Sequence, residues 1–126
     1  MITKISSFGG YIKHLRLNIK EMGLREFCKE NRHDPSNWSK LERGKLPPPN
    51  DEETLEKWAS QLGLKKGSTE WYQYFDLAAL EKGTIPQDIM SDEELVEVLP
   101  IFFRTVRGQK PNKEDLKKLA EILRRA

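Results

Sequence analysis

Apolar residues recur at helical spacing along nearly the whole chain, and no segment shows the sustained apolar–polar alternation that a strand would need. The stripe of the first predicted helix consists of Phe8, Ile12, Leu15 and Ile19. We expect this helix to begin after Ser6 or Ser7, either of which can cap it, and to end at Met22-Gly23. The pattern therefore predicts an all-α protein.

Two short helices are predicted next, separated by a tight break at Arg32-His33-Asp34. The first of them turns Leu24, Phe27 and Cys28 inward. The second begins at Asp34-Pro35, because Asp accepts hydrogen bonds from the first amides and Pro suits the first helical position. It runs to about Glu42 or Arg43, where Gly44 can end it.

Four further helices follow the rigid connector LPPP at 46–49. Asp51 caps the first of them, whose stripe is Leu55, Trp58, Ala59 and Leu62. The next spans about 68–82 and contains the clusters WYQYF (71–75) and LAAL (77–80). Ser91 with Glu94 predicts a capping box for another helix, which Pro100 should kink or split. Asn112 caps the last helix, whose stripe is Leu116, Leu119, Ala120 and Leu123.

Charge divides the chain more clearly than composition does. Residues 1–50 hold 10 Lys or Arg and 5 Asp or Glu, residues 51–100 hold 4 and 12, and residues 101–126 hold 8 and 3. A basic amino-terminal third can meet phosphate, whereas the acidic middle cannot. The single cysteine, Cys28, excludes an internal disulfide, and no apolar run is long enough to span a membrane. The start of the chain lacks a secretory pattern, so we expect a cytoplasmic protein.

The stretch 23–44, GLREFCKENRHDPSNWSKLERG, predicts a helix-turn-helix unit, in which the second helix enters the major groove of DNA. At about 100° per residue, Trp38, Leu41 and Glu42 lie on the inner side of the second helix. Ser36, Lys40 and Arg43 lie on the outer side, with Asn37 and Ser39 flanking them. The outer side thus carries only small polar or cationic groups.

These outer groups suit DNA. Lys40 can donate to guanine, Ser36 can pair with any base edge, and Asn37 can read adenine or hold a phosphate. Arg43 and Lys45 are placed for backbone phosphates. The first amides of the helix, which begins at Pro35, add an end that favours anions.

The segment SNWSKLERGKLPPP resembles the signature of the phage-repressor-type helix-turn-helix family, also called the XRE or lambda-repressor-like family. The resemblance covers about residues 8–64 and implies a DNA-binding unit of four or five helices. It implies that Glu42 is an inward carboxylate paired with Arg16 of the first helix. It also implies that Ser36, Asn37 and Lys40 read the groove and that Arg43 contacts phosphate.

The chain departs from the family pattern at two places that matter for the site. Arg32 and His33 stand where the family usually has Gly and an aliphatic residue, although Gly suits a turn that needs positive φ. Gly23, Leu24 and Arg25 stand where the family tends to have Ser or Thr followed by a phosphate-binding Gln. Arg25 is the candidate replacement for that Gln.

Several residues admit a purely structural interpretation. Trp38 could stack on a base, but its spacing with Leu41 favours the core, and Cys28 is better explained as a small core residue than as a redox sensor. The aromatic cluster at 71–75 either packs on the first unit, which we favour slightly, or contacts a partner. The apolar run LPIFF at 99–103 must be covered by the domain, by a second copy or by another protein.

We therefore predict a DNA-binding domain over residues 1–66 and a helical extension over residues 67–126 that dimerises or binds a partner. The favoured function is a dimeric transcriptional regulator that binds double-stranded DNA at an inverted repeat. The alternative is an antitoxin whose residues 68–126 also cover a partner toxin. No nucleophile–base pair, metal-ligand spacing or phosphate loop is recognisable, so we expect no enzyme, metal or cofactor.

Overall fold

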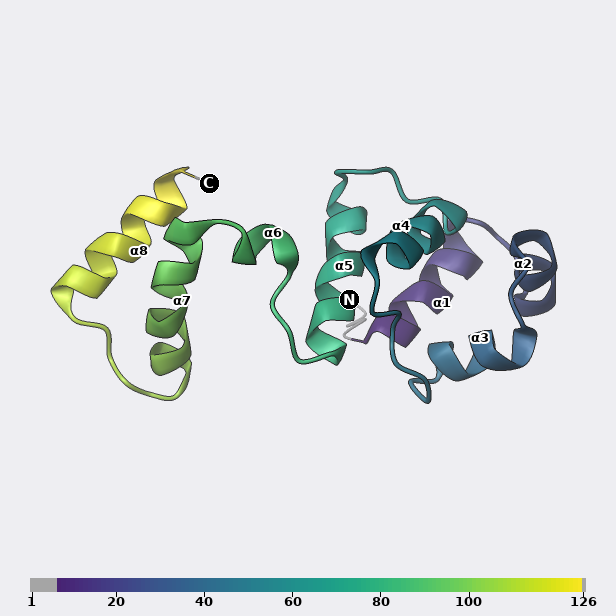
Figure 1. Ribbon diagram of the computed structural model, residues 1–126, viewed down its shortest axis with the longest axis horizontal. Helices are drawn as coiled ribbons and strands as arrows, with labels where there is room; N and C mark the ends of the chain where they lie inside the picture. The colour runs from purple at the N-terminus through teal and green to yellow at the C-terminus, as the bar shows by residue number, and fades with distance from the viewer. Residues whose placement is uncertain (1–6, 126) are drawn as a thin grey trace. The chain divides into compact units, whose positions relative to one another are not determined.

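The computed structural model describes residues 7–125, and every regular element within that range is an α-helix (Figure 1). The helices are α1 (Phe8–Asn18), α2 (Leu24–Asn31), α3 (Pro35–Glu42), α4 (Glu52–Gln61), α5 (Thr69–Glu81), α6 (Gln87–Met90), α7 (Glu93–Val106) and α8 (Lys113–Arg125). The all-α prediction is confirmed. None of these helices is long and apolar enough to cross a membrane.

The chain forms two compact units, the first ending at Thr84 and the second beginning at Ile85. The first unit thus extends past residue 66, where we expected the boundary. The reason is that α5 packs against α1 and α4. The Tyr74 ring lies 5.2 Å from that of Phe8, and its hydroxyl donates a hydrogen bond to the Leu55 carbonyl oxygen at 2.9 Å.

Helix α1 lies at the centre of the first unit and packs against both α3 and α5. Three of its four predicted stripe residues, Phe8, Ile12 and Leu15, are fully buried. Ile19 is instead 46% exposed, because α1 already ends at Asn18 and Ile19 is its C-cap. The prediction that this helix continues to Met22 was therefore wrong.

Side-chain caps fix where α1, α3, α4 and α5 begin, whereas the N-cap of α2 is Gly23, which has no side chain to cap it. Ser7, Asp34, Asp51 and Ser68 each accept a hydrogen bond from a backbone amide of the first turn that follows. Such caps satisfy amides that have no partner within the helix. Ser6, the other cap considered for the first helix, lies outside the described residues.

The second unit differs from the sequence prediction at three points. The short helix α6 lies where no helix was predicted. Asp92, and not Ser91, caps α7, while Ser91 ends the short helix α6 and donates its hydroxyl to the Gln87 carbonyl at 2.8 Å. Helix α7 also continues through Pro100 without a break. Pro100 is exposed, so water can replace the helical hydrogen bond that its missing N–H removes.

Candidate nucleic-acid interface

Helices α2 and α3 are joined by a turn of three residues, as expected for a helix-turn-helix unit. Arg32 has a left-handed backbone conformation (φ 59°, ψ 46°). The phage-repressor-type family, which this segment resembles, usually has Gly at this position. The amide of His33 donates to the Cys28 carbonyl oxygen at 2.8 Å and so closes the end of α2. A side chain at a left-handed position costs about 1–2 kcal/mol, so the turn has the expected conformation with an unfavourable residue.

The His33 ring replaces the usual aliphatic residue by joining an aromatic cluster. It stacks on Trp38 at 4.5 Å and on Phe27 at 5.9 Å, and it meets Trp58 edge-on at 5.4 Å. Its Nε2 lies 2.6 Å from Oε1 of Gln61. This packing role of His33 could not be predicted from the sequence, because only the fold brings Trp58 and Gln61 of α4 to the turn.

Arg16 and Glu42 form the ion pair that the resemblance implies. The Arg16 Nε and Nη2 atoms donate to the two Glu42 carboxylate oxygens at 2.7 and 2.9 Å, and both side chains are almost fully buried. Arg16 Nη1 also donates to the Met22 carbonyl, while Trp38 Nε1 donates to Glu42. These bonds raise the pKa of Arg16 and hold α1, the α1–α2 connection and α3 together.

Gly9 sets how closely α1 approaches the carboxyl end of α3. A Cβ atom at this position would overlap the carbonyl oxygens of Leu41 and Glu42. Only glycine permits this backbone-to-backbone contact, which fixes the position of α3 on the domain. The sequence does contain a signal, since Gly9-Gly10 interrupts a helical pattern, but it does not identify the opposing backbone.

The outer side of α3 is open to solvent. Ser36, Lys40 and Arg43 are exposed, as are the predicted flanking contacts Arg25, Pro35 and Lys45, whereas Ser39 is half-buried. Arg43 Nε donates to the hydroxyl and the carbonyl of Ser39, both at 3.3 Å, so its guanidinium lies back along the helix. Because Glu42 points inward, the outer side of α3 carries no acidic side chain.

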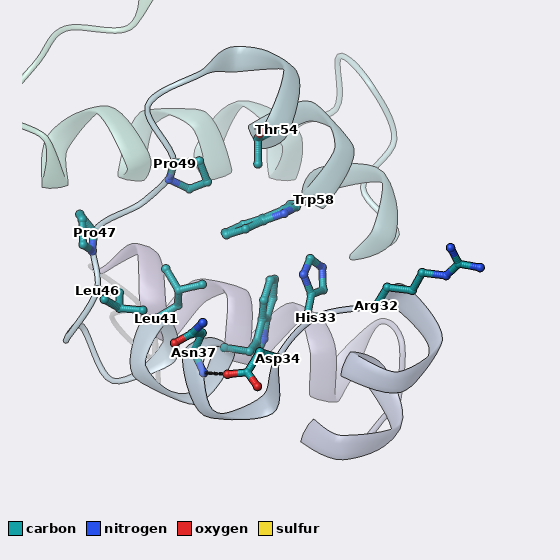
Figure 2. A pocket seen from close by; sticks show the side chains of 11 residues that line it. Arg32, His33, Asp34, Asn37, Leu41, Leu46, Pro47, Pro49, Thr54 and Trp58 are labelled. Atoms are coloured by element: carbon teal, nitrogen blue, oxygen red, sulfur yellow. Dashed lines mark hydrogen bonds between the residues drawn. The ribbon is translucent and has the colours of Figure 1, made fainter.

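Asn37 lies apart from this outer side, on the edge of an open pocket of about 580 Å³ between α3, the connector and α4 (Figure 2). The pocket is lined by Arg32, His33, Asp34, Asn37, Trp38, Leu41, Leu46, Pro47, Pro49, Thr54 and Trp58. The backbone amide of Asn37 donates to the Asp34 carboxylate at 2.9 Å, completing the cap of α3. The structure therefore brings Ser36, Lys40 and Arg43 together but leaves Asn37 beside them.

Burial decides between the interpretations of Trp38 and Cys28. Trp38 is 1% exposed and packed against Phe27 and Trp58, which confirms its core role. Cys28 is fully buried, and burial raises the pKa of its thiol, which disfavours the reactive thiolate. Among residues 7–125 there is no group of three His, Cys, Asp or Glu side chains that could hold a metal ion.

Comparison of the chain with protein-family models, with curated proteins and with solved structures finds no match. A function is therefore inferred from the residues of the α2–α3 unit and from their geometry.

Proposed function

We propose that this protein is a sequence-specific DNA-binding transcriptional regulator that inserts α3 into the major groove of double-stranded DNA. One observation carries the proposal: the exposed side of α3 presents Ser36, Lys40 and Arg43, while its only carboxylate, Glu42, is buried against Arg16. A helix that enters the groove needs small or cationic outward groups, since acidic ones would be repelled by phosphate.

Within this proposal the outward residues have different tasks. Lys40, near the middle of the exposed side, donates to the O6 or N7 atom of a guanine, and Ser36 pairs with a neighbouring base edge. Arg43 leaves its long hydrogen bonds to Ser39 and binds a phosphate. Arg25 and Lys45, exposed before and after this surface, add phosphate contacts that fix the position of α3 along the duplex.

Asn37 has a smaller role in this proposal than the sequence alone indicated. Its side chain lines the pocket beside α3, so it reaches the edge of the interface and not its centre. It therefore contacts a phosphate in preference to an adenine.

The first test is binding of the purified protein to DNA from upstream of its own gene, with nonspecific competitor and over a series of salt concentrations. We expect binding that survives the competitor and weakens steeply with salt, because each phosphate contact releases counterions. Weak binding that the competitor abolishes would contradict the proposal.

Three alanine variants then test the placement of α3. Lys40→Ala should cost about 1–3 kcal/mol at its cognate base and relax specificity there. Arg43→Ala should weaken binding to every sequence. It should also reduce, by about one, the slope of the logarithm of the binding constant against the logarithm of the salt concentration. Lys66→Ala is the matched control: it removes one exposed charge from the α4–α5 loop, well separated from α3 in Figure 1, and should leave binding unchanged. Equal, sequence-independent losses from Lys40→Ala and Arg43→Ala would show that α3 is not the reading helix.

A further inference from the structure

The second unit buries very little of its own apolar surface. Its helices α7 and α8 pack side by side, yet Val98 and Ile101 are the only hydrophobic residues of the described range 85–125 that are buried. Large apolar side chains of this unit remain open to solvent: Met90, Phe102, Phe103, Val106, Leu116 and Leu123. A unit of about 40 residues needs additional burial to be stable, so this surface requires a cover.

Most of the exposed apolar residues belong to one apolar stripe on each helix. On α7 the stripe consists of the half-buried Leu95 and Leu99 and the exposed Phe102 and Val106, and Phe103 lies beside it. On α8 it consists of the exposed Leu116 and Leu123 with the half-buried Ala120 between them. Steps of four and three residues are the spacing at which helices pack along a shared seam. On α7 this stripe is distinct from the side that carries the buried residues Val98 and Ile101.

Both stripes lie on one face of the α7–α8 hairpin. The helices run antiparallel, as shown by the ion pairs Glu94–Arg125 at 2.8 Å and Arg104–Asp115 at 3.6 Å, which join opposite ends of the two helices. At about 100° per residue, the α7 stripe lies about 100° onward from the side of the buried Val98 and Ile101. The α8 stripe also lies about 100° onward, in the same rotational sense, from the less exposed side that carries Asp115, Leu119 and Ile122. In an antiparallel pair this places the two stripes side by side, forming a face that we call the hairpin face.

Charge is segregated along the hairpin. Its open end, taken together with the adjoining helix α6 (residues 87–97 with 121–125), holds six acidic and two basic residues, a net charge of −4. Its turn end, residues 104–118, holds six basic and two acidic residues, a net charge of +4. The middle, residues 98–103 with 119–120, has no charged residue. The hairpin is therefore negative at one end, apolar in the middle and equally positive at the other end.

This pattern is complementary to itself. We infer that the hairpin face binds the hairpin face of a second copy of this chain, with the two hairpins antiparallel about a two-fold axis through the apolar middle. Each −4 open end then meets the +4 turn end of the other copy, and the exposed stripes close into a four-helix bundle. A parallel pairing would place equal charges together and is disfavoured.

The inference does not depend on DNA binding, and its test contains no DNA. We would measure the oligomeric state of the full chain by sedimentation velocity over a range of protein concentrations, with circular dichroism to follow folding. The wild-type chain should be a dimer. Val106→Glu with Leu123→Glu should weaken dimerisation about a hundredfold or more, because both charges would be buried in the dimer interface.

A matched control separates the hairpin face from apolar surface in general. Leu80 on α5 is 70% exposed, as is Val106, but it belongs to the first unit. Leu80→Glu should leave the dimer intact. Val106 and Leu123 are largely exposed within one chain and lie outside the first unit, so the monomeric variant should lose at most the helical content of α7 and α8.

Charge exchange tests the complementarity of the two ends. One variant carries Lys113→Glu, Lys117→Glu and Lys118→Glu at the turn end, and another carries Asp88→Lys, Glu93→Lys and Glu97→Lys at the open end. Each should dimerise poorly alone, whereas an equimolar mixture should form the heterodimer. A monomeric wild-type chain, or a dimer that survives the Val106 and Leu123 changes, would overturn the inference. The first result would assign the hairpin face to a different protein.

Discussion

At the scale of single residues, the α2–α3 turn combines a demanding backbone with side chains that compensate for it. Arg32 has positive φ without being glycine, and His33 next to it is stacked among Phe27, Trp38 and Trp58. The aromatic packing and the His33 amide bond hold the turn in place although Arg32 opposes it. Packing in the core therefore fixes the turn that positions α3, the candidate DNA-reading helix.

Replacing Arg32 with Gly should stabilise the protein, because glycine adopts the left-handed conformation without steric cost. We expect a gain of about 1 kcal/mol in the free energy of unfolding, measured by urea denaturation. Arg25→Gly is the control, since the same replacement inside α2 should lower stability. A loss of stability in Arg32→Gly would mean that the Arg32 side chain stabilises the folded state by more than its left-handed backbone costs.

Tyr74 gives the first unit a defined dependence on alkaline pH. Its side chain is fully buried, and burial raises the pKa of the phenol well above its ordinary value near 10. The folded state therefore binds the proton more tightly than the unfolded state does. The corresponding stability is complete below about pH 10 and is lost as the pH rises toward the folded-state pKa.

Tyr74→Phe should make the loss of stability above about pH 10 less steep, because the buried titrating group is gone. At neutral pH the variant should lose about 1 kcal/mol with the hydrogen bond to the Leu55 carbonyl. Thermal unfolding at several pH values measures both effects. Tyr72→Phe, at a tyrosine that is 46% exposed, should change neither. An unchanged alkaline slope in Tyr74→Phe would contradict this explanation.

At the scale of helices, the position of α3 depends on a close approach to α1. Gly9 allows the backbone of α1 to contact the last turn of α3, and the Arg16–Glu42 pair ties the two helices together from the side. The two contacts act on the same end of α3. They determine how far the outer side of that helix stands from the rest of the domain.

Gly9→Ala should lower the free energy of unfolding by about 1–3 kcal/mol, although alanine is the better helix former, because the added methyl meets backbone and not a flexible side chain. The proposed function adds that DNA affinity should also fall in the variant, measured under conditions where the protein remains folded. Gly23→Ala is the matched control, since nothing lies within 4 Å of a Cβ built there. Unchanged stability in Gly9→Ala would show that α3 can move away at no cost.

At the scale of the whole molecule, the two units differ in how they are stabilised. The first unit contains a contiguous core to which helices α1 to α5 all contribute, whereas the second buries only two hydrophobic residues within its described part. If the second unit is completed by another copy, its local stability depends on protein concentration. The first unit carries its own core and has no such requirement.

Amide hydrogen exchange tests this difference. Protection of α7 and α8 should increase with protein concentration, whereas protection of α1 and α5 should stay constant, because local opening of a dimeric element is linked to dissociation. In the variant with Val106→Glu and Leu123→Glu, protection of α7 and α8 should become independent of concentration. Strong protection of these helices in a dilute wild-type sample would contradict this prediction.

The sequence alone was sufficient for much of what depends on local periodicity and chemistry. It predicted the all-α class, the limits of the α2–α3 unit, the caps at Asp34 and Asp51, and the burial of Trp38, because helix signals act within a few residues. Family resemblance added the pairing of Arg16 with Glu42, which are 26 residues apart.

Only the tertiary structure decided what depends on packing between distant segments. It extended the first unit through α5, since Tyr74 must meet Leu55, and it placed His33 against Trp58 and Asn37 at the edge of a pocket. It also identified Asp92 as the N-cap of α7, although Ser91 is an equally good capping residue by type. It also distinguished the buried side of α7 from the apolar side chains of α7 and α8 that stay exposed, because a helical pattern specifies apolar faces but not what covers them.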